Sequence, residues 1–327
     1  FPKKLMKGIV PKINISKLII YGLNSSKSNK VIKQIKKACL EVGFFTIVGH
    51  GISTKLINST LITSKNFFNL PMYKKLKIAS QRWNKKNSNI YRGYFPSFVN
   101  GKEGLDIGDP NLDSSMTKIL SKDKFECLNL KKVLDDKSTL TIKKYFDCLF
   151  SLGELLFKSI VKSFEADLNI VNKAFVRPKT LTTLRFNYYP KQRKPIEIST
   201  QDGEKLGCET HVDSGIMTIL YQNKKGGLQV QNRDNFKWYN VPYNKNSFVV
   251  NTGLALQQLT NGKFKAANHR VIFNCEKRIS IPFFFEPNYD FVLNPALLKI
   301  KKKPLYKINN YEIFLAQSLK KFIEYKR

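Results

Sequence analysis

The stretch His211-Val212-Asp213-Ser214-Gly215 decides the expected site, because it sets an imidazole and a carboxylate two residues apart. Residues i and i+2 of an extended strand point to the same side, so both side chains can reach one ion. A second imidazole, His269, stands beside Arg270 at the start of a later apolar run. Two histidines and one carboxylate on one face leave open coordination positions on non-haem iron(II). We therefore predict a metal site formed by His211, Asp213 and His269.

A pattern downstream of His269 strengthens this interpretation. An isolated His-x-acid pair is weak evidence, since a core histidine bonded to an aspartate gives the same pattern. Arg278 and Ser280, however, form another same-face pair on an expected strand. A guanidinium binds a carboxylate in a bidentate fork, so this pair predicts a carboxylate clamp. The alternative, that Arg278 is an ordinary surface cation, is disfavoured because apolar residues at 281, 283 and 285 put the segment in the core.

The period of the apolar residues changes near residue 181. Before it, helical spacing predicts helices over about 31–42, 56–68 and 138–165, with a short apolar run at 44–48. After it, short apolar runs separated by glycine, proline and asparagine predict a sandwich or barrel, followed by a helix at 311–325. We expect a largely helical N-terminal region (1–180), a β core (181–290) and a C-terminal extension with its helix (291–327).

The order of the motifs resembles the isopenicillin N synthase-like branch of the iron(II)/2-oxoglutarate dioxygenases over nearly the whole chain. Any one fragment is ordinary, and their shared order is specific. The fragments that carry the resemblance are Gly43-Phe44-Phe45, His50-Gly51-Ile52, Arg92-Gly93-Tyr94, Arg185-Phe186-Asn187-Tyr188-Tyr189-Pro190, His211-Val212-Asp213-Ser214-Gly215, Gly227-Leu228-Gln229-Val230, Asn261-Gly262, His269-Arg270-Val271, Arg278-Ile279-Ser280 and Phe285-Glu286-Pro287.

The resemblance implies a double-stranded β-helix (jelly-roll) core that uses Fe(2+), molecular oxygen and 2-oxoglutarate as co-substrate. The expected enzyme hydroxylates or desaturates an unidentified small molecule and releases succinate and carbon dioxide. Arg278 and Ser280 would hold the distal carboxylate of 2-oxoglutarate, helped by the hydroxyl of Tyr189. Asn187 would contact the co-substrate or pair with neighbouring strand backbone.

The resemblance also suggests substrate contacts, and each has a structural alternative. Arg92 and Tyr94 lie in a loop that the family places near the mouth of the site, although a glycine-centred packing turn would explain them equally. Phe285 would line the pocket or pack in the core. His50 is interpreted as structural, since no acidic residue adjoins it. Many relatives carry Asp where this chain has Leu254. That aspartate is not a metal ligand, so its absence bears on the expected conformation of a local turn more than on the expected activity. The polar segment 191–204 would be a lid or a surface loop.

The formal charge of +33 permits two interpretations. Clustered lysines bind polyanions by releasing counterions. These lysines are instead spread along the chain together with many asparagines and isoleucines, as compositional bias in the coding DNA would produce, so we expect only non-specific attraction to nucleic acid. Two alternatives to the dioxygenase remain: an iron(II) oxidase of the same fold that does not use 2-oxoglutarate, and a polyanion-binding protein of that fold.

The five scattered cysteines do not suggest a disulfide framework or a zinc cluster. No apolar run reaches the length of a membrane span, and no signal peptide is visible. We expect a cytoplasmic monomer that acts on a small molecule and does not contact a membrane.

Overall fold

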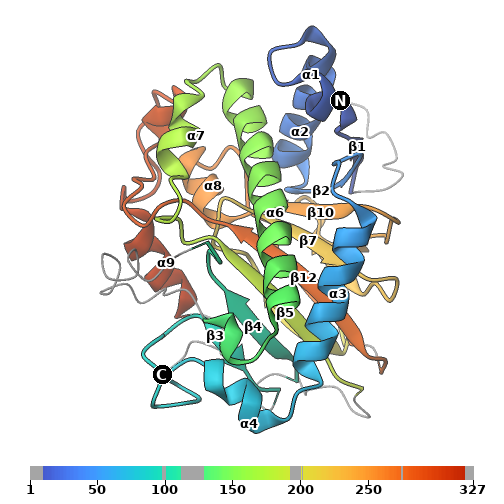
Figure 1. Cartoon of the computed structure of the whole chain (residues 1–327). Coiled ribbons are helices and arrows are strands. Elements are labelled where there is room, and N and C mark those ends of the chain that lie inside the picture. The colour runs from blue at the N-terminus through green and yellow to red at the C-terminus, as the bar shows by residue number, and fades with distance from the viewer. Residues whose placement is uncertain are drawn as a thin grey trace.

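The computed structural model describes residues 10–97, 101–111, 129–191, 200, 202–273 and 275–320. These residues form a large sheet and a small sheet, with helices on the outer face of the large one (Figure 1). The strands of the large sheet are, in spatial order, β1 (Lys12–Asn14), β2 (Phe44–Val48), β10 (Phe248–Thr252), β7 (Met217–Gln222), β12 (Arg278–Phe285), β5 (Thr183–Tyr189), β4 (Glu103–Ile107) and β3 (Gly93–Phe95). Those of the small sheet are β6 (Leu206–His211), β11 (His269–Ile272), β8 (Leu228–Gln231) and β9 (Trp238–Asn240).

From β5 onward the chain alternates between the two sheets. Strands β5, β7, β10 and β12 join the large sheet, while β6, β8, β9 and β11 form the small one. The alternation winds the chain into a jelly roll, as expected. A buried apolar cluster that includes Phe44, Leu228, Val249 and Val271 draws on strands of both sheets.

The helices predicted over 31–42, 56–68, 138–165 and 311–325 correspond to α2 (Asn29–Glu41), α3 (Thr54–Phe68), α6 (Asp136–Ser163) and α9 (Tyr311–Leu319). The shorter helices α1 (Ser16–Tyr21), α4 (Met72–Lys75), α7 (Asn169–Ala174) and α8 (Leu254–Leu259) were not predicted. The Ser53 side chain caps α3 by accepting a hydrogen bond from the Lys55 amide, and Asp135 caps α6 in the same way from Ser138. The end of the helix expected to reach residue 325 lies outside the described residues.

Helix α6 crosses the outer face of the large sheet (Figure 1). Its buried side packs onto β12, where Phe146 meets Phe283 edge to face with ring centroids 5.0 Å apart. At Gly153 an added Cβ would lie 2.6 Å from the Phe285 ring, so only glycine allows this approach. The helix therefore fixes the outward-facing residues of β12 and, with them, the face that β12 turns inward.

The N-terminal region contributes more strand than its helical periodicity predicts. It supplies β1 to β4, of which β2 pairs with β10 and β4 pairs with β5. Residues 10–111 thus extend both ends of the large sheet instead of only covering it. Within the described part of the chain, no helix is both long and apolar enough to cross a membrane.

Candidate active site

The two sheets bring the predicted metal ligands together. His211 ends β6 and His269 begins β11, and the two residues lie directly opposite each other in the antiparallel pair. Asp213 follows β6 instead of lying on it, yet its carboxylate still turns to the same point. Its Oδ1 lies 3.5 Å from His211 Nε2 and 3.6 Å from His269 Nε2. One ligand atom from each residue lies within 4.8 Å of the others, which suits a shared ion.

Backbone carbonyls orient both imidazoles. His211 Nδ1–H donates to Glu209 O over 2.7 Å, and His269 Nδ1–H donates to Ala267 O over 3.2 Å. Because a carbonyl can only accept, each Nδ1 carries a proton, so in the neutral ring, the form that binds a metal, Nε2 has the lone pair. Both lone pairs are thereby available on the side where Asp213 Oδ1 lies, and this is the tautomer that a metal needs.

Two further side chains hold the carboxylate of Asp213. Thr218 Oγ1 donates to Oδ2 over 2.5 Å, and Asn251 Nδ2 donates to the same oxygen over 2.8 Å. Burial by itself raises the pKa of Asp213, but the imidazoles of His269 and His211 and these two hydrogen bonds bring it below its ordinary value. Asp213 is therefore an anion whose Oδ1 is left for an ion. We assigned no role to Thr218 or Asn251 from the sequence, since their contribution depends on the β7–β10 register.

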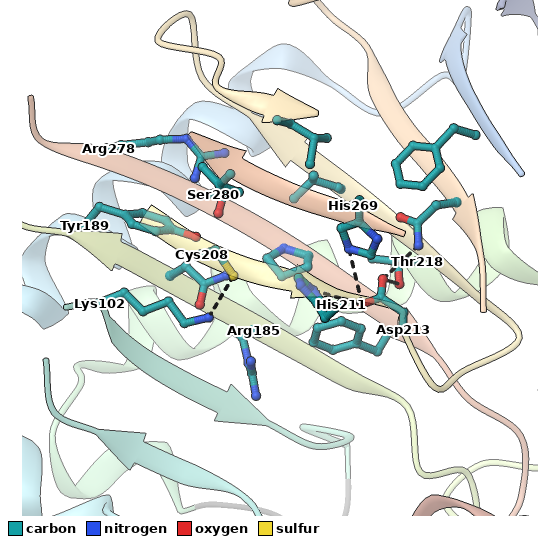
Figure 2. A pocket seen from close by; sticks show the side chains of 18 residues that line it. Lys102, Arg185, Tyr189, Cys208, His211, Asp213, Thr218, His269, Arg278 and Ser280 are labelled. Atoms are coloured by element: carbon teal, nitrogen blue, oxygen red, sulfur yellow. Dashed lines mark hydrogen bonds and ion pairs between the residues drawn. The ribbon is translucent and has the colours of Figure 1, made fainter. Parts of the chain in front are cut away.

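The predicted carboxylate clamp lies at the other end of the same cavity (Figure 2). Arg278 begins β12, and its side chain is directed inward together with Ser280. The Arg278 residue is 4% exposed, and its Nε and Nη1 have no hydrogen-bond partner among the described residues. Buried guanidinium nitrogens without an acceptor are costly, so this arrangement fits an anion that would accept from Nε and Nη1.

Strand pairing places the other two predicted residues beside the clamp. Tyr189 lies opposite Arg278 and Asn187 lies opposite Ser280 in the β5–β12 pair. The guanidinium carbon of Arg278 is 4.8 Å from the centre of the Tyr189 ring. Asn187 Oδ1 also has no hydrogen-bond partner within the described chain. All four residues line the cavity, whose space is ≈ 540 Å³ with its open mouth included.

The side chains predicted to contact substrate do not reach this cavity. Tyr94 is fully buried and donates to Glu103 Oε2 over 2.6 Å. Arg92 is buried against Gly108 and donates to Thr182 O over 3.4 Å. The structure therefore favours the packing alternative for both.

Phe285 is corrected in the same way. Its ring stacks on that of Phe175 with centroids 3.9 Å apart, on the outer face of the sheet. The physical reason is strand alternation: residues 278, 280, 282 and 284 of β12 line the cavity, so residue 285 faces α6.

His50 has a structural role, as expected. Its Nδ1 accepts from the Ile52 amide over 3.1 Å, and its Nε2–H donates to Asn246 O over 3.2 Å. Both ring nitrogens are used, which leaves no lone pair for a metal. Leu254, which stands where many relatives carry Asp, begins α8. Its backbone amide donates a hydrogen bond to Asp213 O over 2.8 Å. Most of the segment 191–204 lies outside the described residues.

A jelly roll that encloses two histidines and one carboxylate beside a buried arginine is the arrangement of mononuclear non-haem iron oxygenases. Comparison with known proteins agrees. The model of the 2OG-Fe(II) oxygenase superfamily matches residues 181–287, and that of the non-haem dioxygenase N-terminal region (described for morphine synthesis) matches residues 10–138.

Individual relatives extend the match over most of the chain. A probable iron/ascorbate oxidoreductase of Dictyostelium discoideum is 30% identical over 316 residues, covering 87% of this chain and 85% of that protein. Isopenicillin N synthase of Streptomyces griseus is 29% identical, covering 90% and 89%. A full-length Neurospora crassa protein, solved in complex with α-ketoglutarate, superposes with a TM-score of 0.77 at 23% identity, covering 95% of each chain, and supports the fold.

The chain belongs to the 2OG-Fe(II) oxygenase superfamily, in its isopenicillin N synthase-like branch. It is a non-haem iron(II)- and 2-oxoglutarate-dependent dioxygenase that acts on an unidentified small molecule.

Proposed function

We propose that His211, Asp213 and His269 bind the iron(II) of this dioxygenase. The support is the convergence of their ligand atoms, the two fixed tautomers and the ionised carboxylate. Bound iron(II) supplies oxygen activation, in which oxidative decarboxylation of 2-oxoglutarate to succinate and carbon dioxide accompanies oxidation of a substrate C–H bond. The residues of the chain hold the ion on one face and leave the other face to co-substrate and oxygen.

We also propose that Arg278 and Ser280 bind the distal carboxylate of 2-oxoglutarate, with Tyr189 and Asn187 beside it. The single observation that carries this assignment is the buried guanidinium whose Nε and Nη1 lack an acceptor among the described residues. Carboxylate binding there would satisfy these donors and fix the co-substrate with its keto-acid end toward the metal ligands. Leu220, Leu228 and Val271 line the space between and would exclude water from it.

The test is co-substrate turnover by the iron-loaded protein. The protein is loaded with iron(II) without oxygen, mixed with 2-oxoglutarate and exposed to oxygen, and succinate is measured. We expect slow succinate release in the wild type and none in Asp213→Asn. Absence of both succinate and calorimetric binding of 2-oxoglutarate would instead favour an oxidase that uses Arg278 and Ser280 to bind a carboxylate of its own substrate.

Three broader expectations also stand as proposals: that the protein is a monomer, that it is cytoplasmic, and that it attracts nucleic acid only through its net charge. None of the four cysteines in the described part of the chain forms a disulfide, which is consistent with a reducing compartment. A steep loss of nucleic-acid affinity with salt, without preference between single and double strands, is the result expected for non-specific attraction. We further propose that the catalytic core spans residues 181–290, with flanking regions at 1–180 and 291–327.

A further inference from the structure

The segment 299–308, which joins the end of the core to α9, carries the densest block of lysines in the chain. Five of the nine residues from 299 to 307 are lysine, and no Asp or Glu occurs between Asp290 and Glu312. All five lysines are exposed, and none forms an ion pair with another described residue. The proposed function uses none of them. The segment, called here the basic loop, is therefore a local concentration of unmatched positive charge.

Apolar side chains stand among these lysines. Leu305, between Lys303 and Lys307, is 72% exposed, the largest exposed fraction of any large apolar side chain in the described part of the chain. Ile308 is 42% exposed. A single exposed leucine is ordinary on a protein surface. An exposed leucine with lysines on both sides is the pattern of a surface that meets both apolar and anionic groups.

Helix α8 and the residues that follow it hold the basic loop in one conformation. Asn261 Nδ2 donates to Lys303 O over 3.0 Å, and Asn261 Oδ1 accepts from the Leu305 amide over 2.7 Å. Gln258 Nε2 donates to Lys307 O over 2.7 Å. The backbone is thus bonded on both sides of Leu305, so a partner that binds here would have little chain entropy to overcome.

The position of Leu305 favours a lipid surface over a nucleic acid as the partner. Both carry phosphates that attract lysines. At a bilayer an apolar side chain can enter the boundary between headgroups and acyl chains, while the long lysine side chains keep their ammonium groups at headgroup level. A single-stranded nucleic acid instead stacks its bases on free aromatic rings. The aromatic residue of the basic loop, Tyr306, is held by a hydrogen bond from Gln257 Nε2 to its hydroxyl over 3.1 Å.

We propose that the basic loop is a binding surface for an anionic lipid bilayer. Leu305 enters the headgroup boundary, and the five lysines lie against the lipid phosphates and carboxylates. A polybasic patch and an apolar side chain are two weak signals that together give reversible membrane binding. Such contact needs no membrane-spanning helix, and it departs from the expectation, drawn from the lack of a long apolar run, that the protein does not contact a membrane.

The experiment measures binding of the full chain to vesicles of phosphatidylcholine mixed with phosphatidylserine, and to vesicles of phosphatidylcholine alone, by flotation at about 0.15 M salt. We expect the wild type to bind the mixed vesicles. The combined variant Lys301→Gln, Lys302→Gln and Lys303→Gln should bind them about 10-fold or more weakly, because each lysine near an anionic surface adds to the attraction. Leu305→Ser should bind them about 3-fold or more weakly, because the apolar contact is lost.

Matched controls separate this surface from the net charge of the whole protein. The combined variant Lys77→Gln, Lys85→Gln and Lys86→Gln removes the same charge at three exposed lysines elsewhere. Leu140→Ser removes another exposed leucine, on α6. Both controls should keep the affinity of the wild type within about 2-fold, since surface electrostatics fall off within a Debye length.

Three results would overturn the inference. The first is a wild type that does not bind the mixed vesicles. The second is an equal loss in the two lysine variants, or in Leu305→Ser and Leu140→Ser, since net charge or general apolar surface would then explain the binding. The third comes from titrating single- and double-stranded oligonucleotides into the same variants. A loss of oligonucleotide affinity as large as the loss of vesicle affinity on changing Lys301 to Lys303 would assign the surface to nucleic acid instead.

Discussion

Thr218 and Asn251 lie opposite each other on β7 and β10, and both donate a hydrogen bond to the same oxygen of Asp213. The pairing register of β7 with β10, both in the large sheet, thus sets the orientation of the Asp213 carboxylate. Asp213 itself follows β6, which belongs to the small sheet. The remaining oxygen, Oδ1, faces the two imidazoles. The large sheet thereby fixes the carboxylate of the candidate metal site.

The first prediction tests this support. Thr218→Val keeps the shape of the side chain but removes the hydrogen bond to Oδ2, so the carboxylate should turn more freely. Loss of such a partner typically weakens metal affinity about 10- to 100-fold, and we expect an effect of that size on iron(II) binding. Thr182→Val is the matched control, since that buried hydroxyl donates to Glu286 O instead. Equal iron affinity in the two variants would show that Thr218 does not support the metal site.

The second prediction compares two of the three histidines of the chain. His269→Ala should lose stoichiometric iron(II), because one of the three ligands is removed. His50→Ala should keep it, since both ring nitrogens of His50 are engaged by backbone groups. Iron content after anaerobic loading and desalting is the measurement. Full iron content in His269→Ala would show that the ion is held elsewhere.

The third prediction concerns the co-substrate. Arg278→Met should weaken 2-oxoglutarate binding about 10- to 100-fold, since a hydrogen bond to a charged group contributes about 1.5–3 kcal/mol. Ser280→Ala should have a smaller effect, about 2- to 10-fold. Arg233→Met, at an arginine that donates to Leu40 O outside the cavity, is the control. Calorimetric titration of each iron-loaded variant gives the comparison, and an Arg278 variant with wild-type affinity would exclude the clamp.

The fourth prediction is a pH dependence of stability. Burial raises the pKa of Glu286 from 4.5 to about 8, although the hydrogen bond from the Tyr311 hydroxyl partly opposes this. A carboxyl whose pKa is higher in the folded protein binds more protons there, so the free energy of unfolding falls as pH rises between those values. The slope from one such group is at most about 1.4 kcal/mol per pH unit.

Glu286→Gln removes this titration and keeps an acceptor for Tyr311. Stability of the variant relative to the wild type should therefore rise between pH 5 and pH 8, as measured by chemical denaturation at each pH. Parallel curves for the two proteins would show that Glu286 does not bind an additional proton on folding.

The side chains that the sequence predicts for the metal site and the clamp all line one cavity, and for the clamp the reason is strand alternation. Arg278 and Ser280 are two positions apart, and the structure turns both inward. The same rule could have excluded Phe285, which is an odd number of residues from Arg278 and so faces α6. The resemblance to the family predicts the order of the motifs along the chain, but it does not predict the direction in which each side chain points.

Other features depended on contacts that spacing cannot reveal. Strand β6 is mixed in polarity, so its final histidine could be found from the sequence but the strand itself could not. The roles of Thr218 and Asn251 follow from register between strands that are distant in sequence. The chain has many lysines, and nothing in the sequence distinguishes Lys102, which lines the cavity, from the others. Its inward direction follows from the packing of Glu103 on the opposite face of the sheet.

A crystal structure of the protein soaked with iron(II) and 2-oxoglutarate without oxygen is the most direct test. Anomalous scattering locates the iron independently of the surrounding density. We predict one iron bonded to His211 Nε2, Asp213 Oδ1 and His269 Nε2, with the distal carboxylate of 2-oxoglutarate on Arg278. An iron peak away from these three atoms, or Arg278 turned to solvent with the co-substrate elsewhere, would contradict this prediction.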